Sequence, residues 1–318
     1  MLQEPFYYLT FYHFVTLDSP ESAVKKHKDY LKNRDIKCRI YFSKEGVNAV
    51  LSGRQADAEH YMEWLKSDPR FADVWFKIHT GQEHSLPHQT VKKREQLVAM
   101  DMKVDLKQTG AYMTPEQWAE TIEKRDENTL IIDVRNKYES DVGYFEGAER
   151  PSLTTFRDFP KYVSELKKRY DGKKTKVLTY CTGGIRCELY TVLLKNEGFE
   201  HVHQLHGGVV NYGQQMGGKH WRGKLFMFDD RLAIPLAEGQ KEEVVSSCHH
   251  CKNPADVFYN CAHMSCNALF IGCPECVKAF EGCCCESCKG EDHRRPFVPV
   301  TKPKPFRRLS HASNSCSL

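Results

Sequence analysis

Residues 181–187 are Cys-Thr-Gly-Gly-Ile-Arg-Cys, and they join a short apolar run at 177–180 to a helix-like run at 188–194. Cys181 therefore follows a predicted buried strand and precedes a predicted helix. The N–H groups of so short a loop, the helix N-terminus and the Arg186 side chain all favour a thiolate over a thiol. We therefore predict that Cys181 is a nucleophile assisted by Arg186. The expected anion-binding amides are those of Thr182, Gly183, Gly184 and Ile185.

The second cysteine of this loop, Cys187, has two interpretations. It can resolve an oxidised Cys181, because the two residues are six positions apart across a tight turn. It can also be a small side chain packed beneath the helix that follows. Packing is the favoured interpretation, because buried unreactive cysteines are common.

Strand and helix patterns alternate on both sides of the loop. Predicted buried strands lie at 130–134, 177–180 and 202–205, and predicted helices at 115–124, 156–170 and from the loop to about 196. Thr114, Pro115 and Gln117 have the pattern of a capping box that begins the first helix. This alternation predicts a parallel α/β sheet, in which chemistry lies beyond the carboxyl ends of the strands. Cys181 is at such an end.

The first ninety residues have the pattern of a separate domain. Strands are predicted at 6–15, 37–42, 47–51 and 74–79, and helices at 21–32 and 55–66. The order β-α-β-β-α-β is that of the ferredoxin-like sandwich. That fold alone assigns no function.

Cysteines are concentrated near the C-terminal end. Ten of the 14 lie within residues 248–288, and they occur in close pairs that predict two tetrahedral thiolate sites. Zinc is the expected metal, bound by alternate or by successive pairs; disulfides, free thiols or an iron–sulfur cluster are the alternatives. His249, His250 or His263 can replace one sulfur. The predicted ligands are Cys248, Cys251, Cys261, Cys266, Cys273, Cys276, Cys285 and Cys288, with Cys283 or Cys284 as substitutes for Cys285.

These features together resemble a known family. Asp133, Val134 and Arg135, the segment 143–148, the loop 181–186 and the turn at Gly207 and Gly208 resemble a rhodanese domain. With the N-terminal domain, the residues Phe226, Phe228, Asp229, Asp230 and Arg231, and the cysteine-rich end, the chain resembles the TrhO family of rhodanese-domain tRNA uridine(34) hydroxylases. The resemblance covers about residues 6–288. It implies an α/β fold class: a rhodanese-like parallel sheet domain, preceded by a ferredoxin/acylphosphatase-like α+β sandwich and followed by a Cys-rich metal-binding-type segment.

The resemblance also implies an activity. It implies oxygen-dependent hydroxylation of the wobble uridine of tRNA to 5-hydroxyuridine, with Cys181 as nucleophile or persulfide residue and with molecular oxygen and an unidentified reductant consumed. Thiolate addition to C6 of uracil would make C5 electron-rich, which suits such an oxidation. Two alternatives stay open. One is a rhodanese-type sulfurtransferase that passes persulfide sulfur to an acceptor, tRNA among the candidates, and the other is a zinc-stabilised RNA-binding module.

Charge and hydropathy indicate where the protein acts and what it binds. No apolar stretch approaches the ~18 residues of a membrane span, and the first residues lack the order of a signal peptide, so we expect a cytoplasmic protein with no membrane partner. The net charge of +4 comes mainly from the end of the chain, and phosphate-rich partners such as tRNA suit it; no DNA partner is expected. The basic side chains there are Lys289, Arg294, Arg295, Lys302, Lys304, Arg307 and Arg308.

Five regions are expected along the chain: a ferredoxin/acylphosphatase-like domain at 1–90, a linker at 91–112, a rhodanese domain at 113–222, a Cys-rich domain at 223–290 and a basic disordered tail at 291–318. The basic cluster Lys92, Lys93 and Arg94 is a candidate for RNA contact, although a solvated face explains it more simply.

Overall fold

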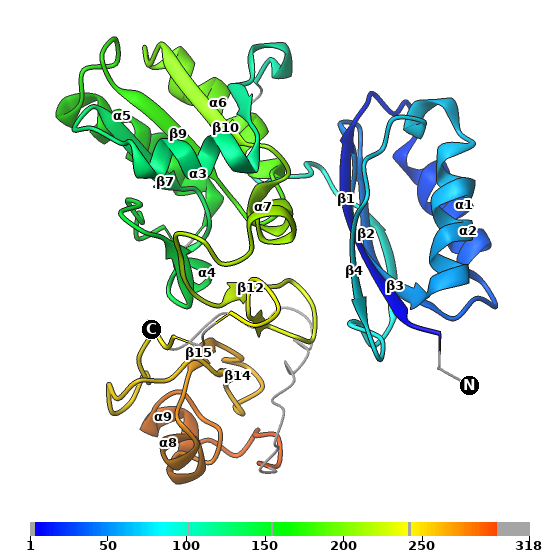
Figure 1. Cartoon of the computed structure of the whole chain (residues 1–318). Helices are drawn as coiled ribbons and strands as arrows, with labels where there is room; N and C mark the ends of the chain where they lie inside the picture. The colour runs from blue at the N-terminus through cyan, green and yellow to red at the C-terminus, as the bar shows by residue number, and fades with distance from the viewer. Residues whose placement is uncertain (1–3, 101, 103, 154, 241–242, 298–318) are drawn as a thin grey trace.

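The computed structural model describes residues 4–297 apart from 101, 103, 154, 241 and 242. Figure 1 shows an N-terminal domain, a central domain and a smaller C-terminal domain that follows the central one. The expected fold class is confirmed, because a sandwich precedes a parallel-sheet domain and a cysteine-rich domain follows it. Among the helices described, none has the length and apolar character needed to cross a membrane.

The N-terminal domain is a sheet covered by two helices on one face. The core lies between sheet and helices, where alternate residues of the first strand, Leu9 and Phe11, are fully buried. Thr10 and Tyr12 point to the opposite face, which is turned toward the central domain (Figure 1). The sheet order is β4-β1-β3-β2-β5. The elements are β1 (Phe6–Phe14), α1 (Pro20–Leu31), β2 (Ile36–Ser43), β3 (Gly46–Arg54), α2 (Gln55–Lys66), β4 (Lys77–Gly81) and β5 (Gln89–Lys93).

The fifth strand differs from the sequence prediction. The first four strands have the predicted ferredoxin-like arrangement, but β5 adds to the edge of the sheet, parallel to β2. The expected linker from residue 91 therefore begins inside a strand. Sequence patterning missed β5 because its only buried residue is Val91, which leaves no apolar alternation to detect.

The central domain has the predicted parallel sheet, in the order β6-β10-β9-β7. Helices α5 and α6 contribute to the core on one face of the sheet, and α3 and α7 to the core on the other. The capping box that begins α3 is present, since the Gln117 N–H donates to Thr114 Oγ1 over 3.3 Å and the Thr114 N–H donates to Gln117 Oε1 over 3.0 Å. The elements are β6 (Ala111–Met113), α3 (Pro115–Glu123), β7 (Thr129–Asp133), α5 (Phe159–Arg169), β9 (Lys176–Tyr180), α6 (Ile185–Asn196), β10 (His201–Leu205) and α7 (Gly208–Met216).

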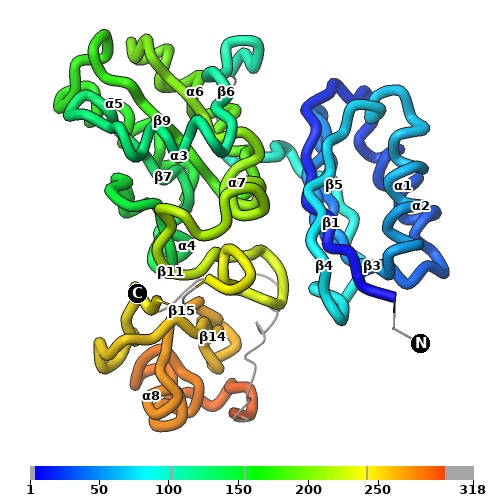
Figure 2. The backbone as a smooth tube through the Cα atoms, viewed as in Figure 1, coloured from blue at the N-terminus to red at the C-terminus, as the bar shows by residue number. Residues whose placement is uncertain are grey.

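Short elements after β7 complete the central domain. Helix α4 (Lys137–Ser140) has only four residues, and β8 (Gly143–Phe145) pairs antiparallel with β11 (Trp221–Gly223). The pair β12 (Leu225–Phe226) and β13 (Ala233–Ile234) then leads toward the C-terminal domain. As the tube in Figure 2 shows, α4 lies at the end of the central domain that faces the C-terminal one.

The C-terminal domain has a core made largely of cysteines. It contains the hairpin β14 (Phe258–Asn260) and β15 (Leu269–Ile271) and the short helices α8 (Pro274–Ala279) and α9 (Glu286–Lys289). Arg294 and Arg295, expected in a disordered tail, are part of this domain: Arg294 pairs with Glu281, and Arg295 Nη1 donates to the Cys261 carbonyl over 2.8 Å. The remaining basic residues of the predicted tail, Lys302, Lys304, Arg307 and Arg308, lie outside the described residues.

Candidate active site

Cys181 lies where the sequence predicts it, directly after β9 and before α6. Gly184 is the N-cap of α6 with φ at 101°, a left-handed conformation that glycine adopts without strain. This turn aims the Gly184 N–H at the Cys181 sulfur, to which it donates over 3.1 Å. The sulfur is fully buried, so its ionisation depends on these internal donors rather than on water.

The surroundings of Cys181 favour its thiolate. Burial alone raises the pKa of this thiol, but the hydrogen-bonded Cys187 thiol, the Arg186 charge and the N–H groups of Arg186 and Cys187 outweigh burial and lower the pKa to about 5. Burial and the neighbouring sulfur raise the pKa of Cys187 well above its ordinary value. At neutral pH Cys187 is therefore the protonated donor and Cys181 the ionised acceptor. Cys187 lies in the first turn of α6 and packs in the core of the central domain, and its role as a resolving thiol stays a hypothesis.

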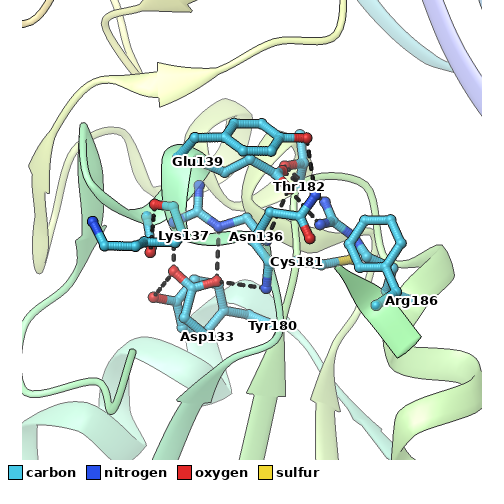
Figure 3. Close-up of polar contacts among 12 residues, drawn as sticks. Asp133, Asn136, Lys137, Glu139, Tyr180, Cys181, Thr182 and Arg186 are labelled. Carbon is cyan, nitrogen blue, oxygen red and sulfur yellow. Dashed lines mark hydrogen bonds and ion pairs between the residues drawn. The ribbon is translucent and has the colours of Figure 1, made fainter. Parts of the chain in front are cut away.

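Arg186 has a partner that the sequence did not reveal. Its guanidinium forms a bidentate ion pair with Glu139 of α4: Nη1 donates to Oε1 over 2.6 Å, and Nη2 donates to Oε2 over 2.8 Å. Thr182 Oγ1 donates to the same carboxylate over 3.1 Å, as Figure 3 shows. Both charges are buried, so the pair fixes the loop to α4. Arg186 thus holds the loop in shape while its charge still favours the thiolate.

The residues Asp133 and Arg135 support the sheet edge beside the loop. Arg135 Nε and Nη2 donate to the Asp133 carboxylate over 2.8 and 2.6 Å, and Tyr180 Oη donates to it over 2.8 Å. All three side chains are fully buried, and Figure 3 shows Asp133 and Tyr180 below Thr182 and Glu139. They tie the end of β7 to the end of β9, and so position the residue after β9, Cys181.

A cavity of about 1110 Å³ separates the open face of the N-terminal sheet from this loop. Thr182, Gly183, Ile185 and Arg186 form one wall, and Cys181 is buried at the base of the same loop. The cavity is large enough for a nucleotide with its flanking phosphates. Its cations are Arg39, Lys44, Arg94, Arg157 and Arg186, its acids Glu45 and Glu95, and its aromatic side chains Tyr12, Tyr41, Phe156 and Phe228. Of the predicted basic cluster Lys92, Lys93 and Arg94, only Arg94 lines it.

The N-terminal domain contributes side chains that sequence analysis did not assign to the site. Tyr12 Oη donates to Glu188 Oε1 over 2.8 Å, and Tyr112 Oη donates to the same carboxylate over 2.9 Å. Glu188 is the residue after Cys187, so the Tyr12 bond joins β1 of the N-terminal domain to the first turn of α6, and the Tyr112 bond joins β6 of the central domain to the same turn. The available sequence signal was the alternation of β1, which places Tyr12 on the face opposite the core.

The paired cysteines converge into two groups of four. Within each group the sulfur atoms lie within 4.8 Å of one another, and none of the described cysteines is in a disulfide. A tetrahedral ion with bonds of ~2.3 Å would hold its sulfurs ~3.8 Å apart. The Cys251–Cys273 and Cys266–Cys284 sulfur distances are both 3.7 Å, so each group can hold a metal ion. The groups are Cys248, Cys251, Cys273 and Cys276, and Cys261, Cys266, Cys284 and Cys288.

The two groups show which of the predicted ligands lie close enough together to share a metal ion. The pairs combine alternately rather than successively, and His249, His250 and His263 belong to neither group. The prediction of Cys285 requires correction, because Cys284 takes its place. Cys284 is fully buried in the group, whereas Cys285 is half-buried. The Cys285 sulfur lies at the edge of the group, 3.9 Å from the Cys284 sulfur and 3.1 Å from Ser287 Oγ, and is not one of the four.

Comparisons with known proteins cover nearly the whole chain. Residues 6–97 match the model of the UPF0176 acylphosphatase-like domain, residues 114–215 the rhodanese-like domain and residues 222–289 the rhodanese C-terminal domain. A protein of Protochlamydia amoebophila named tRNA uridine(34) hydroxylase is 48% identical over 98% of this chain and 97% of its own length. Proteins of the same name from Chlamydia abortus and Chlamydia pneumoniae are 45% and 44% identical, over 100% and 99% of both chains.

Proposed function

The chain belongs to the family of tRNA uridine(34) hydroxylases, and from this premise we propose that it hydroxylates the wobble uridine of tRNA to 5-hydroxyuridine in the cytoplasm. The observation that carries the proposal is the ionised Cys181 at the base of a loop that walls a basic, aromatic cavity. A thiolate supplies the nucleophile, and the cavity supplies a place for an RNA nucleotide.

Cys181 starts the reaction by covalent addition. Its sulfur bonds to C6 of the uracil ring, and the electron pair of the C5–C6 double bond moves to C5 and O4. C5 then takes a hydroxyl oxygen from a peroxide-level oxidant, formed when a two-electron donor reduces molecular oxygen. The second oxygen leaves as water. Loss of the C5 proton and departure of the thiolate from C6 restore the double bond. Overall, uridine, oxygen, two electrons and two protons yield 5-hydroxyuridine and water.

The cavity suits a single-stranded RNA segment. Arg39, Lys44 and Arg94 come from strands and loops of the N-terminal domain, and Arg157 faces them from the central domain. Phosphates on either side of the uridine would contact these cations, while Tyr41 and Phe228 offer faces for stacking. The Arg94 guanidinium already lies 4.7 Å from the centre of the Tyr41 ring, so charge and stacking surface are combined there. Because Cys181 is fully buried, the uridine reaches the sulfur only after the loop and the N-terminal sheet separate locally.

The two cysteine groups hold structural zinc in this proposal. Each ion would bind four thiolates and crosslink segments that are up to 28 residues apart. The C-terminal domain has few apolar side chains apart from its cysteines, so metal binding would supply much of its folding free energy. The alternate pairing interlocks the two sites. The two cysteine pairs that would bind one ion lie, in the sequence, on either side of a pair that would bind the other ion.

Nucleoside analysis tests the proposed function. A strain that lacks its own wobble-uridine hydroxylating enzymes should regain 5-hydroxyuridine in its tRNA when it carries this gene, and the empty vector should not restore it. The purified protein is expected to release little thiocyanate from thiosulfate and cyanide. Efficient thiocyanate release without 5-hydroxyuridine would favour the sulfurtransferase alternative.

A further inference from the structure

A buried lysine of the N-terminal domain lies beside the active-site loop. Lys77 begins β4 and pairs with Thr10 of β1, on the sheet face turned toward the central domain. Its side chain is only 2% exposed. Across the described residues, its ammonium is within ion-pair distance of no carboxylate and donates no hydrogen bond. A buried charge without a direct partner is costly, so it calls for an anion nearby.

Two aromatic rings hold this ammonium against the loop. It lies 5.0 Å from the centre of the Tyr12 ring and 4.8 Å from that of Trp75, distances typical of cation–π contacts. Tyr12 packs on Gly184, where an added methyl group would lie 3.0 Å from its hydroxyl oxygen. Trp75 packs on Gly207, where such a group would lie 2.5 Å from the ring. The two rings that contact the Lys77 ammonium therefore also contact the loop and the neighbouring turn.

Two anionic groups act on Lys77. They are Cys181 and Glu188, both of which favour its charged form. Glu188 already accepts hydrogen bonds from Tyr12, Tyr112, Thr109 and Gln204, so donors from three segments stabilise its charge. The Cys181 thiolate accepts from the N–H groups of its loop and from the Cys187 thiol, and Arg186 is the cation nearest to it in sequence. The other ionisable neighbour is His206, whose pKa is lowered first by burial and then by the Lys77 charge, so it is neutral at pH 7.

Lys77 is charged under the conditions in which the thiolate forms. Burial lowers the pKa of its ammonium to about 8, and the charges of Cys181 and Glu188 oppose that effect. Between pH 5 and pH 8 both the thiolate and the ammonium are therefore present. Tyr12, the nearest ionisable side chain of the same sheet, stays neutral, because burial and Glu188 raise its pKa well above the ordinary value.

We propose that Lys77 is a positioning residue that the N-terminal domain supplies to the catalytic loop, where its charge stabilises the Cys181 thiolate. The active site is thus shared between two domains, and ionisation of the nucleophile depends on their contact. The catalytic consequence rests on the proposed hydroxylase function, whereas the effect on ionisation does not.

Titration of Cys181 in the full-length protein tests this inference. Thiolate absorbance at 240 nm is measured against pH for Lys77→Met, and the same curve for the double variant with Cys181→Ser is subtracted. The midpoint is expected to rise by about 0.5 pH unit or more when the cation is removed. Lys77→Arg should keep the wild-type midpoint. Lys28→Met, which removes an exposed lysine of α1, is the matched control and should also keep it.

The outcomes separate the inference from the proposed function. Coinciding midpoints for Lys77→Met and the wild type would overturn the inference, even if tRNA is hydroxylated normally. A raised midpoint in a protein that forms no 5-hydroxyuridine would support it and reject the hydroxylase function. Thermal unfolding confirms that the variant is folded, and Lys77→Gln replaces Lys77→Met if the latter is not.

Discussion

Transfer RNA from cells that carry the Cys181→Ser form is expected to contain no 5-hydroxyuridine above the background of a strain without the gene. A serine hydroxyl fits the same space and can still accept the Gly184 N–H. It stays protonated at neutral pH, however, whereas the pKa of the thiol is about 5. Loss of the ionised nucleophile should slow the reaction by about 10³-fold or more. Mass spectrometry of digested tRNA measures the product.

A matched control isolates the role of Cys181 from the loss of any thiol. Cys285→Ser also removes one sulfur, but from outside both metal groups and far along the chain from the loop. Its 5-hydroxyuridine should remain at the wild-type level. If the Cys181→Ser form, with an unchanged thermal midpoint, still produced 5-hydroxyuridine normally, covalent catalysis by this sulfur would be excluded.

Replacing Cys284 with serine should remove one of two zinc ions per chain, whereas the neighbouring Cys285→Ser should retain both. Cys284 is fully buried among the sulfurs of Cys261, Cys266 and Cys288. A serine there leaves three thiolates, which bind zinc far more weakly than four. Because metal binding supplies folding free energy, the variant should also lose its C-terminal fold and become sensitive to proteolysis.

Metal analysis of the purified proteins by mass spectrometry decides between these two cysteines. The ratio of zinc to protein is expected to be two for the wild type and for Cys285→Ser, and at most one for Cys284→Ser. The reverse pattern would show that Cys285 is the ligand, as the spacing alone suggested. If the purified protein were instead brown and contained iron and acid-labile sulfide, the cysteines would hold an iron–sulfur cluster rather than zinc.

Local patterns predicted much of this molecule. The strand, turn and helix around Cys181 are neighbours in sequence, so apolar runs and glycines were sufficient to place this cysteine between β9 and α6. The first four strands alternate strongly enough for the ferredoxin-like order. Arg186 was found for the same reason, but its partner Glu139 lies on a four-residue helix, too short for any periodic signal.

The parts that sequence analysis missed depend on contacts between distant segments. Lys77 and Tyr12 approach Cys181 only because two domains pack together, and more than 100 positions separate them from it. The choice of Cys284 over Cys285 depends on which way one side chain points, which the spacing of adjacent cysteines does not encode. Strand β5 forms because the edge of β2 accepts it, although its own residues are mostly polar.

The ionisation of Cys181 is the central claim, and a difference titration measures it most directly. The 240 nm absorbance of the wild type is recorded from pH 4 to pH 10, and that of the Cys181→Ser form is subtracted, so that the cysteines outside the loop cancel. We expect one thiolate to appear with a midpoint near pH 5, the pKa that its neighbours produce. A midpoint near pH 9, the ordinary value of a thiol, would contradict the account.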